Sequence, residues 1–304
     1  MDLDIERFSF ALSLTSIPFY ITGFIGNVLV IRIVHKTRAM HTTTNYLLAN
    51  LAASDCVTIL LAPLYFYSHL LSHQSNGFGN FTCKFLVLTY ISVAATSFTL
   101  TLLAIERYHA LLKPFRTGLR LKKDNVKKAI IIIWIASILL CSPEFFIQEW
   151  SETFSTCVGV WSFHINQTSR VLMIRFCIFT SYIPLAIFLY CYGSLIKGLH
   201  FTNTICSANG TEEDRSNKKK LVVTFMMATA GFVICYLPIQ VFYTFVALGG
   251  DKHISFKLHS TLSALVTFIF DCSLCFNPIL YAFRSTSFRD GFKRIMLCRR
   301  KPSE

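Results

Sequence analysis

A few charged side chains stand inside long apolar stretches of this 304-residue chain, namely Asp55, Arg175 and Asp271. An acid and a base, Glu106 and Arg107, are adjacent at the end of another apolar stretch. An ionisable group at membrane depth costs about 2.5–3.5 kcal/mol on insertion scales, so it marks a functional site unless it only joins helices by hydrogen bonds. The loops carry no nucleophile–base pair and no metal-ligand spacing. We therefore expect ion pairing and hydrogen-bonded switching, with no enzyme activity, no cofactor and no metal site.

The elements that must position these residues are membrane spans. Hydrophobic residues make up 53% of the chain and charged residues 15%, whereas soluble domains devote about a quarter of their residues to charge. Stretches of roughly 20 apolar residues are long enough to cross the hydrocarbon layer as helices. Seven such stretches predict an all-α bundle, with spans at about 12–34, 46–70, 84–107, 129–147, 171–196, 221–247 and 258–283.

The positive residues predict how these spans are oriented. Of the 29 Lys and Arg, 23 fall in the loops that share a side with the C-terminus. By the positive-inside rule, we expect a plasma-membrane protein with its N-terminus outside and its C-terminus in the cytoplasm. The first span would serve as its own insertion signal, since the acidic N-terminus does not resemble a signal peptide. The net charge of +13 is spread over short clusters between apolar runs, so we expect no nucleic-acid partner.

Residues 1–283 form the predicted seven-span domain, and residues 284–304 a short helix and tail. Phe288, Phe292, Ile295 and Met296 recur at helical spacing, opposite several basic residues. This pattern predicts an amphipathic helix lying on lipid at the inner membrane surface, with Cys298 as a palmitoylation site.

Modifications follow from the same topology. Asn80, Asn166 and Asn209 begin N-x-[S/T] triplets, but only Asn80 and Asn166 would lie outside, where glycans are added. Cys83 and Cys157 are the two cysteines expected outside, where oxidation is favoured, so they can pair with each other.

Seven short motifs occur in order along the chain, one in each span. Together with Cys83 and Cys157, they make the chain resemble a rhodopsin-like (class A) G-protein-coupled receptor over nearly its whole length. The motifs are "GNVLV", "NYLLANLAASD", "ERY" (Glu106, Arg107, Tyr108), Trp134, Pro184 with Tyr192, "FVICYLP" and "NPILY" (Asn277, Pro278, Tyr281).

The resemblance implies a two-state switch. Arg107 would be held by Glu106 at rest and would meet a heterotrimeric G protein when the sixth span swings outward, with Tyr192 and Tyr281 turning inward. Pro238 would supply the hinge and Phe232 the packing that shifts. A polar cluster would favour the closed state; it would contain Asn27, Asp55, Thr96 and Asn277. Arrestin and a receptor kinase are the further partners that the resemblance implies.

Four departures modify these expectations. Tyr236 replaces the family's usual Trp before the hinge, and Lys218 stands where an acid often latches spans three and six, which predicts basal signalling. Ser273 and Leu274 replace two usual oxygen ligands, so we do not expect sodium to act. Cys83 is one residue closer to "ERY" than usual, which would rotate the outer end of span three by about 100°.

The ligand is predicted less sharply. Asp271 stands where an opsin carries its retinal lysine, so a Schiff base cannot form. Thr89 stands where amine receptors carry an aspartate. Asp271 would pair with a cationic group of the ligand, or with Arg175 if that side chain points inward; the alternative is a carboxyl satisfied inside the protein. The other expected lining residues are Tyr90, Val93, Phe179, Tyr236, Gln240, Tyr243 and Thr267.

Glu144, Glu149 and Glu152 near the mouth would attract a basic ligand. We therefore expect an extracellular neuropeptide first and a small amine second. A transporter is a weaker alternative, because no inverted repeat and no chain of ionisable residues is visible.

Overall fold

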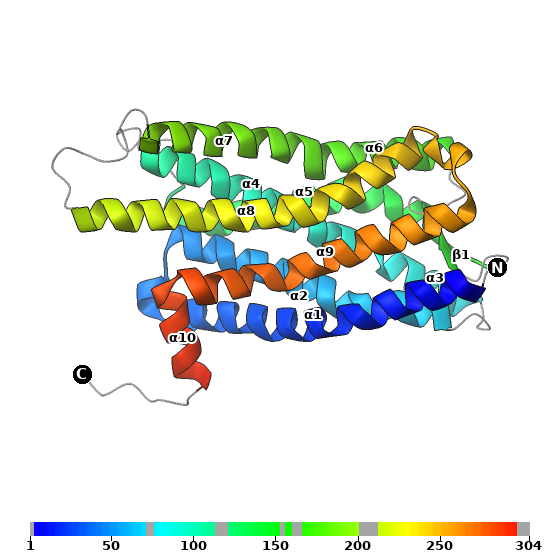
Figure 1. Ribbon diagram of the computed structural model, residues 1–304, viewed down its shortest axis with the longest axis horizontal. Coiled ribbons are helices and arrows are strands. Elements are labelled where there is room, and N and C mark those ends of the chain that lie inside the picture. The colour runs from blue at the N-terminus through cyan, green and yellow to red at the C-terminus, as the bar shows by residue number, and fades with distance from the viewer. Residues whose placement is uncertain are drawn as a thin grey trace.

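Seven long helices run side by side in the computed structural model (Figure 1). The structure describes residues 3–70, 76–112, 121–152, 156–159, 166–200 and 212–296. The N-terminus lies at the end of the bundle that carries the Cys83–Cys157 disulfide, called here the disulfide end. The C-terminus lies at the other end, called here the Arg107 end.

All seven predicted spans are confirmed as helices that are long and apolar enough to cross a membrane. Most begin earlier or end later than predicted, because a helix continues through polar residues beyond the lipid. The spans comprise α1 (Leu3–Lys36), α2 (Thr43–Leu70), α4 (Val87–Leu112), α5 (Lys123–Ile147), α6 (Gln167–Cys177) with α7 (Ile183–His200), α8 (Glu212–Ala247) and α9 (Phe256–Arg284).

The fifth span is not one regular helix. A π-helical segment, η3 (Ile178–Tyr182), joins α6 to α7, and Pro184 follows it directly. Short 3-10 helices lie between other spans: η1 (Arg38–Met40) precedes α2, and η4 (Gly250–His253) precedes α9.

The third span is interrupted near its beginning. A short helix, α3 (Asn76–Phe85), ends one residue before α4, with a turn at Leu86 between them. The amide of Thr89 donates to the Leu86 carbonyl at 3.0 Å, which is the tighter spacing of a 3-10 turn. The sequence predicted one continuous helix from residue 84, so this break is a correction. The turn at Leu86 lies three residues after Cys83, which is one residue closer to "ERY" than is usual in the family the chain resembles.

A β-hairpin covers the disulfide end. Strands β1 (Glu149–Ser151) and β2 (Thr156–Val158) pair antiparallel, and the predicted Cys83–Cys157 disulfide joins β2 to α3. The amide of Trp150 donates to Asn80 Oδ1 at 2.7 Å. The hairpin is therefore fixed to α3 covalently and by a hydrogen bond.

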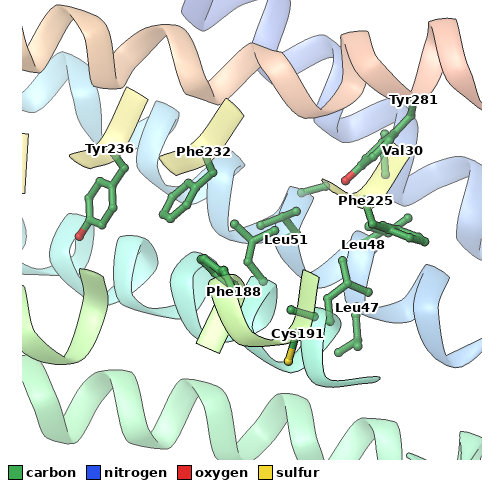
Figure 2. Packing of buried hydrophobic residues seen from close by; sticks show 14 of the residues in the cluster. Val30, Leu47, Leu48, Leu51, Phe188, Cys191, Phe225, Phe232, Tyr236 and Tyr281 are labelled. Carbon is green, nitrogen blue, oxygen red and sulfur yellow. The ribbon is translucent and has the colours of Figure 1, made fainter. Parts of the chain in front are cut away.

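The core runs along the middle of the bundle, where α1, α2, α4, α7 and α8 contribute apolar side chains (Figure 2). Close approach of α1 to α9 depends on Gly26, since a Cβ added there would lie 2.7 Å from Pro278 Cβ. Helix α5 is the least buried span, with 22% of its apolar window inside the protein. Its outer face carries Ile131, Ile135 and Leu139, as expected of a helix facing lipid.

The predicted amphipathic helix is present as α10 (Thr286–Met296). Phe288 is buried, and its ring stacks on Tyr281 with centroids 5.3 Å apart, while Arg289, Lys293 and Arg294 are exposed. Phe292 is half-buried and also packs against the core, so two apolar residues of α10 hold this helix to the bundle. Cys298, the predicted palmitoylation site, lies outside the described residues.

The contact at Gly26 gives a stability prediction. Gly26→Ala should destabilise the protein by about 1–3 kcal/mol, because the rigid Pro278 ring cannot yield to the added methyl group. Gly193→Ala on α7 is the matched control, since nothing lies within 4 Å of its added Cβ. Thermal unfolding in detergent should show a lower Tm for the first variant only. Equal Tm values would contradict the close packing of α1 on α9.

Candidate functional site

Arg107, near the end of α4, is held by side chains from three helices. Its guanidinium donates to the carboxylate of the preceding Glu106 and to the hydroxyl of Thr44 on α2. It also lies 5.2 Å from the ring centre of Phe225 on α8, within the range of a cation–π interaction. Glu106 and Phe225 are both buried. Arg107 therefore links α2, α4 and α8 at this end of the bundle.

Phe225 was not predicted from the sequence. The sequence predicted only that the family's acidic latch to the sixth span is missing, since Lys218 stands at the matching place. Helix α8 runs through Lys218 and brings Phe225 under Arg107 about two turns further on. An aromatic residue in a mostly apolar span carries no sequence signal of such a contact.

The predicted switch tyrosines are buried close to Arg107. Tyr192 on α7 shares a 2.8 Å hydrogen bond with the hydroxyl of Thr229 on α8. Tyr281 on α9 packs on Phe288, and its hydroxyl has no hydrogen-bond partner among the described residues. Tyr108 shares a 3.2 Å hydrogen bond with Tyr190. An unpaired buried hydroxyl is costly, so Tyr281 lacks a stabilising hydrogen bond in this arrangement.

The predicted polar cluster is assembled in part. Asp55 on α2 accepts hydrogen bonds from Thr96 Oγ1 at 3.3 Å and from Asn277 Nδ2 at 3.4 Å. Asn27 does not reach Asp55; its Nδ2 donates at 2.9 Å to the carbonyl of Leu274 on α9. Leu274 is four residues before Pro278, which has no N–H, so its carbonyl lacks the usual helical donor. Asn27 supplies that donor from α1.

A second polar junction joins the first half of the bundle. Trp134 Nε1 on α5 donates to Asn50 Oδ1 on α2 at 2.9 Å, and Asn50 Nδ2 donates to Thr99 Oγ1 on α4 at 2.8 Å. The sequence identified Trp134 as a family motif, but it did not indicate that Trp134 bonds Asn50 or that Asn50 bonds Thr99. This junction fixes three helices relative to one another.

Asp271 is satisfied inside the protein. Its carboxylate accepts a 2.9 Å hydrogen bond from Ser16 on α1, and both side chains are buried. The alternative in which Asp271 pairs with Arg175 is wrong. Arg175 on α6 instead donates to Glu144 Oε1 on α5 at 3.0 Å, and to the carbonyl of Leu140. The neighbouring helix offers a carboxylate, and an arginine in lipid takes the partner within reach.

The same contact corrects the expectation for Glu144. It was expected among the acids at the mouth, but its side chain is 0% exposed and is occupied by Arg175. Glu149 and Glu152 are exposed at the disulfide end, as expected.

The predicted ligand residues gather in part at the disulfide half of the bundle. Val93, Tyr236 and Gln240 are buried, and Gln240 Oε1 has no hydrogen-bond partner within the described part of the chain. Tyr243 reaches Ser263 on α9 at 3.4 Å. The remaining residues, Thr89, Tyr90 and Thr267, are half-buried.

Phe179 is not brought into this group. Its side chain is 47% exposed, whereas the neighbouring Thr180 is buried and shares a 3.0 Å hydrogen bond with the Tyr236 hydroxyl. The π-helical segment η3 decides which residue turns inward, and a π turn cannot be deduced from the apolar pattern. Thr180 was missed from the sequence for this reason.

Comparison with known proteins identifies the family. Residues 26–281 match the family model described as 7 transmembrane receptor (rhodopsin family). The chain belongs to this family. The resemblance drawn from the motifs is thereby confirmed, and the protein is a multi-pass membrane receptor of the class A type.

Similar receptors cover most of the chain. A QRFP-like peptide receptor of Branchiostoma floridae is 28% identical, over 92% of this chain and 76% of that protein. A Substance-P receptor of Homo sapiens is 27% identical, over 91% and 69% respectively, and a galanin receptor 2a of Danio rerio is 27% identical, over 95% and 79%. The crystal structure of squid rhodopsin matches with a TM-score of 0.78 at 18% identity, covering 98% of this receptor and 89% of that chain. This last likeness supports the fold.

The receptor also has a clamp at its disulfide end that the sequence did not indicate. Arg170 on α6 donates to the carbonyls of Val246 and Ala247 at 2.7 and 3.3 Å, and to Asp251 Oδ2 in η4 at 2.8 Å. The two carbonyls belong to the last turn of α8, and the Val246 carbonyl also accepts the Gly249 amide at 3.0 Å. Arg170 therefore ties the end of α8 to the start of the fifth span.

This clamp makes stability depend on pH. Burial raises the pKa of the Asp251 carboxyl, but the hydrogen bond and charge of Arg170, with Lys252, outweigh burial and lower that pKa below its ordinary value of 3.8. A carboxyl with a lowered pKa stabilises the folded state above its unfolded pKa, and this contribution is lost as the pH falls through the folded pKa.

Asp251→Asn should therefore lower the Tm of the receptor at pH 7, because losing a hydrogen bond between charged groups costs about 1.5–3 kcal/mol of stability. The Tm difference from the unaltered receptor should shrink as the pH falls below about 4. Thermal unfolding between pH 7 and pH 3 measures it, with Asp290→Asn, an exposed acid on α10, as the control. A difference that persists unchanged at pH 3 would show that Arg170 acts through packing alone.

Proposed function

We propose that this receptor binds an extracellular neuropeptide and activates a heterotrimeric G protein by an outward movement of α8 at the Arg107 end. The observation that carries the coupling is Arg107, which lies largely enclosed between Glu106, Thr44 and Phe225. A guanidinium stays charged when buried, so it is a group that can be released toward a partner. Its contact with α8 is an aromatic ring, which separates when α8 moves away.

The proposal that the ligand is a peptide is based on the related receptors. The QRFP-like, Substance-P and galanin receptors are peptide receptors by name, and each matches over nine-tenths or more of this chain. The aspartate with which amine receptors hold an ammonium is Thr89 here. Asp271 lies on the opposite wall and is occupied by Ser16. An amine ligand is therefore the outcome that the ligand test must exclude.

The proposal includes the orientation predicted from the basic residues, with the disulfide end outside and the Arg107 end in the cytoplasm. Asn166, exposed at the start of α6, and Asn80 would then carry glycans, and Cys298 a palmitoyl group. The exposed basic residues of α10 would contact lipid. Arrestin and a receptor kinase would bind at the Arg107 end.

Coupling can be tested on Arg107. In membranes that hold the receptor and a panel of G proteins, a neuropeptide library should contain a peptide that accelerates nucleotide exchange. Arg107→Ala should abolish that acceleration, because no other charge replaces the guanidinium. Arg32→Ala is the matched control, since Arg32 is an exposed arginine of α1 at the Arg107 end of the bundle, and this variant should keep the accelerated nucleotide exchange. Stimulated exchange that survives Arg107→Ala would refute the proposed coupling, and activation by amines alone would refute the peptide.

The role of Asp271 can be separated from its bond to α1. If Asp271 binds a cationic group of the agonist, Asp271→Asn should lower agonist potency at least about tenfold, the effect of losing a hydrogen bond to a charged group. Ser16→Ala removes one hydrogen bond from α1 and keeps the carboxylate, so it should leave potency within about threefold. Equal losses in both variants, measured as agonist concentration–response curves, would mean that Asp271 serves only to join α1 and α9.

A further inference from the structure

A chain of buried hydrogen bonds connects the third, fifth and sixth spans at the level of Tyr236. Ser97 Oγ on α4 donates to the carbonyl of Thr180 in η3 at 2.6 Å. The hydroxyl of Thr180 is 3.0 Å from the hydroxyl of Tyr236 on α8. Ser97 and Thr180 are 0% exposed and Tyr236 is 3% exposed, so water does not compete for these bonds. The three side chains are called here the Ser97–Thr180–Tyr236 relay.

The direction of the bond to Tyr236 follows from counting protons. Thr180 Oγ1 also lies 2.8 Å from the carbonyl of Phe176, to which it donates. A hydroxyl has one proton, so Thr180 has none left to donate to Tyr236. The Tyr236 hydroxyl is therefore the donor and Thr180 Oγ1 the acceptor.

Ser97 bonds the fifth span where its helix is irregular. Thr180 lies in the π-helical segment η3, where the Ile183 amide donates to the Ile178 carbonyl five residues earlier, and Pro184, which has no N–H, follows directly. In lipid, water is absent, so backbone carbonyls in an irregular segment must find donors within the protein. Ser97 supplies such a donor to the Thr180 carbonyl from α4.

Tyr236, at the far end of the relay, also belongs to an aromatic pair on α8. The Tyr236 ring stacks on Phe232 with centroids 4.8 Å apart and an interplanar angle of 28° (Figure 2). A cavity lined in part by Phe232, Pro184 and Phe188 lies between α7 and α8 at this level. The Tyr236 ring cannot follow α8 away from the fifth span unless its bond to Thr180 breaks.

The relay also begins near the predicted ligand residues. Phe176, whose carbonyl receives the Thr180 proton, contacts the ring of Tyr90 edge-on at 6.2 Å. A shift of Tyr90 or Phe176 therefore reaches Thr180 through the backbone of the fifth span.

We propose that the Ser97–Thr180–Tyr236 relay holds α8 in its closed position and that Tyr236 is a positioning residue of the switch, acting through its hydroxyl. The inference rests on the proposed function in one respect, that α8 is the helix that moves. The relay takes the part of the family's acidic latch, at whose place this chain has Lys218. Closure then depends on hydroxyl bonds within the membrane as well as on Arg107 and Phe225 at its edge.

The test removes the bond without changing the ring. Tyr236→Phe should raise basal nucleotide exchange about two- to tenfold, the factor by which losing one hydrogen bond shifts a closed–open equilibrium. Tyr182→Phe is the matched control, since it removes a 2.7 Å bond between the same two segments, from Tyr182 in η3 to Thr244 on α8, outside the relay. The control should leave basal exchange unchanged. An equal rise in both variants, or no rise in Tyr236→Phe, would overturn the relay.

Thr180→Val supplies a second variant, which removes the acceptor and keeps the shape of the side chain. It should raise basal exchange by a similar factor. Combining it with Tyr236→Phe should add little, because the two variants break the same bond between Tyr236 and Thr180. Additive effects would overturn the assignment to that bond. Should Tyr236→Phe fail to fold, Thr180→Val alone decides the question by the same criteria.

A readout without a G protein separates this inference from the proposed function. Spin labels at Ala110 on α4 and Lys220 on α8, introduced as unnatural amino acids because the chain has 11 cysteines, report the distance between the two helices at the Arg107 end. Tyr236→Phe should enrich the longer distance. If no G protein responds to the unaltered receptor, the proposed coupling fails, and the label distances still decide the relay. Unchanged distances in Tyr236→Phe and Thr180→Val would overturn it.

Discussion

The arrangement of the helices depends on the need to satisfy every backbone acceptor inside a membrane, where water is absent. Prolines create that need at defined carbonyls four residues earlier. Ser142 Oγ donates to the Leu139 carbonyl, which Pro143 leaves free. Asn27 donates to the Leu274 carbonyl, which Pro278 leaves free, and Ser97 donates to the Thr180 carbonyl in the π-helical segment before Pro184. The last two donors come from another helix. Helix breaks that would weaken single spans thereby join α4 to the fifth span and α1 to α9.

Charged groups follow the same constraint with different partners. Arg175 and Glu144 pair between α5 and α6, and Asp55 is shared by hydrogen bonds from α4 and α9. Removing Arg175 would leave the carboxylate of the fully buried Glu144 without its ion-pair partner, which is destabilising. These contacts involve helices other than α8. They therefore stabilise a part of the bundle against which another helix can move.

Helix α8 is held differently at its two ends. At the disulfide end, Arg170 binds its last carbonyls and Asp251, and α8 lies close to α6 (Figure 1). Toward the Arg107 end, α8 diverges from α7 in the view of Figure 1, and Arg107 touches it through the Phe225 ring. Tyr192 also bonds Thr229 of α8 near this end, so α8 is held there by a ring contact and a hydroxyl pair, and at the disulfide end by a charged clamp. This asymmetry favours the pivoting movement of α8 in the proposed function. Between the two ends stands Tyr236, where the family's usual Trp is replaced by a ring whose hydroxyl can bond.

The sequence by itself determined the seven spans, their order, the disulfide between Cys83 and Cys157, and the family, because apolar length and the spacing of motifs are local properties of the chain. It also located the charged residues that need partners. Only the tertiary structure decided which partners they have: Arg175 binds Glu144 and not Asp271, Thr180 faces Tyr236 in place of Phe179, and Phe225 lies under Arg107. These outcomes depend on how each helix is rotated about its axis. That rotation is set by a turn at Leu86, a π segment at 178–182 and the packing of many side chains at once, none of which a local pattern records.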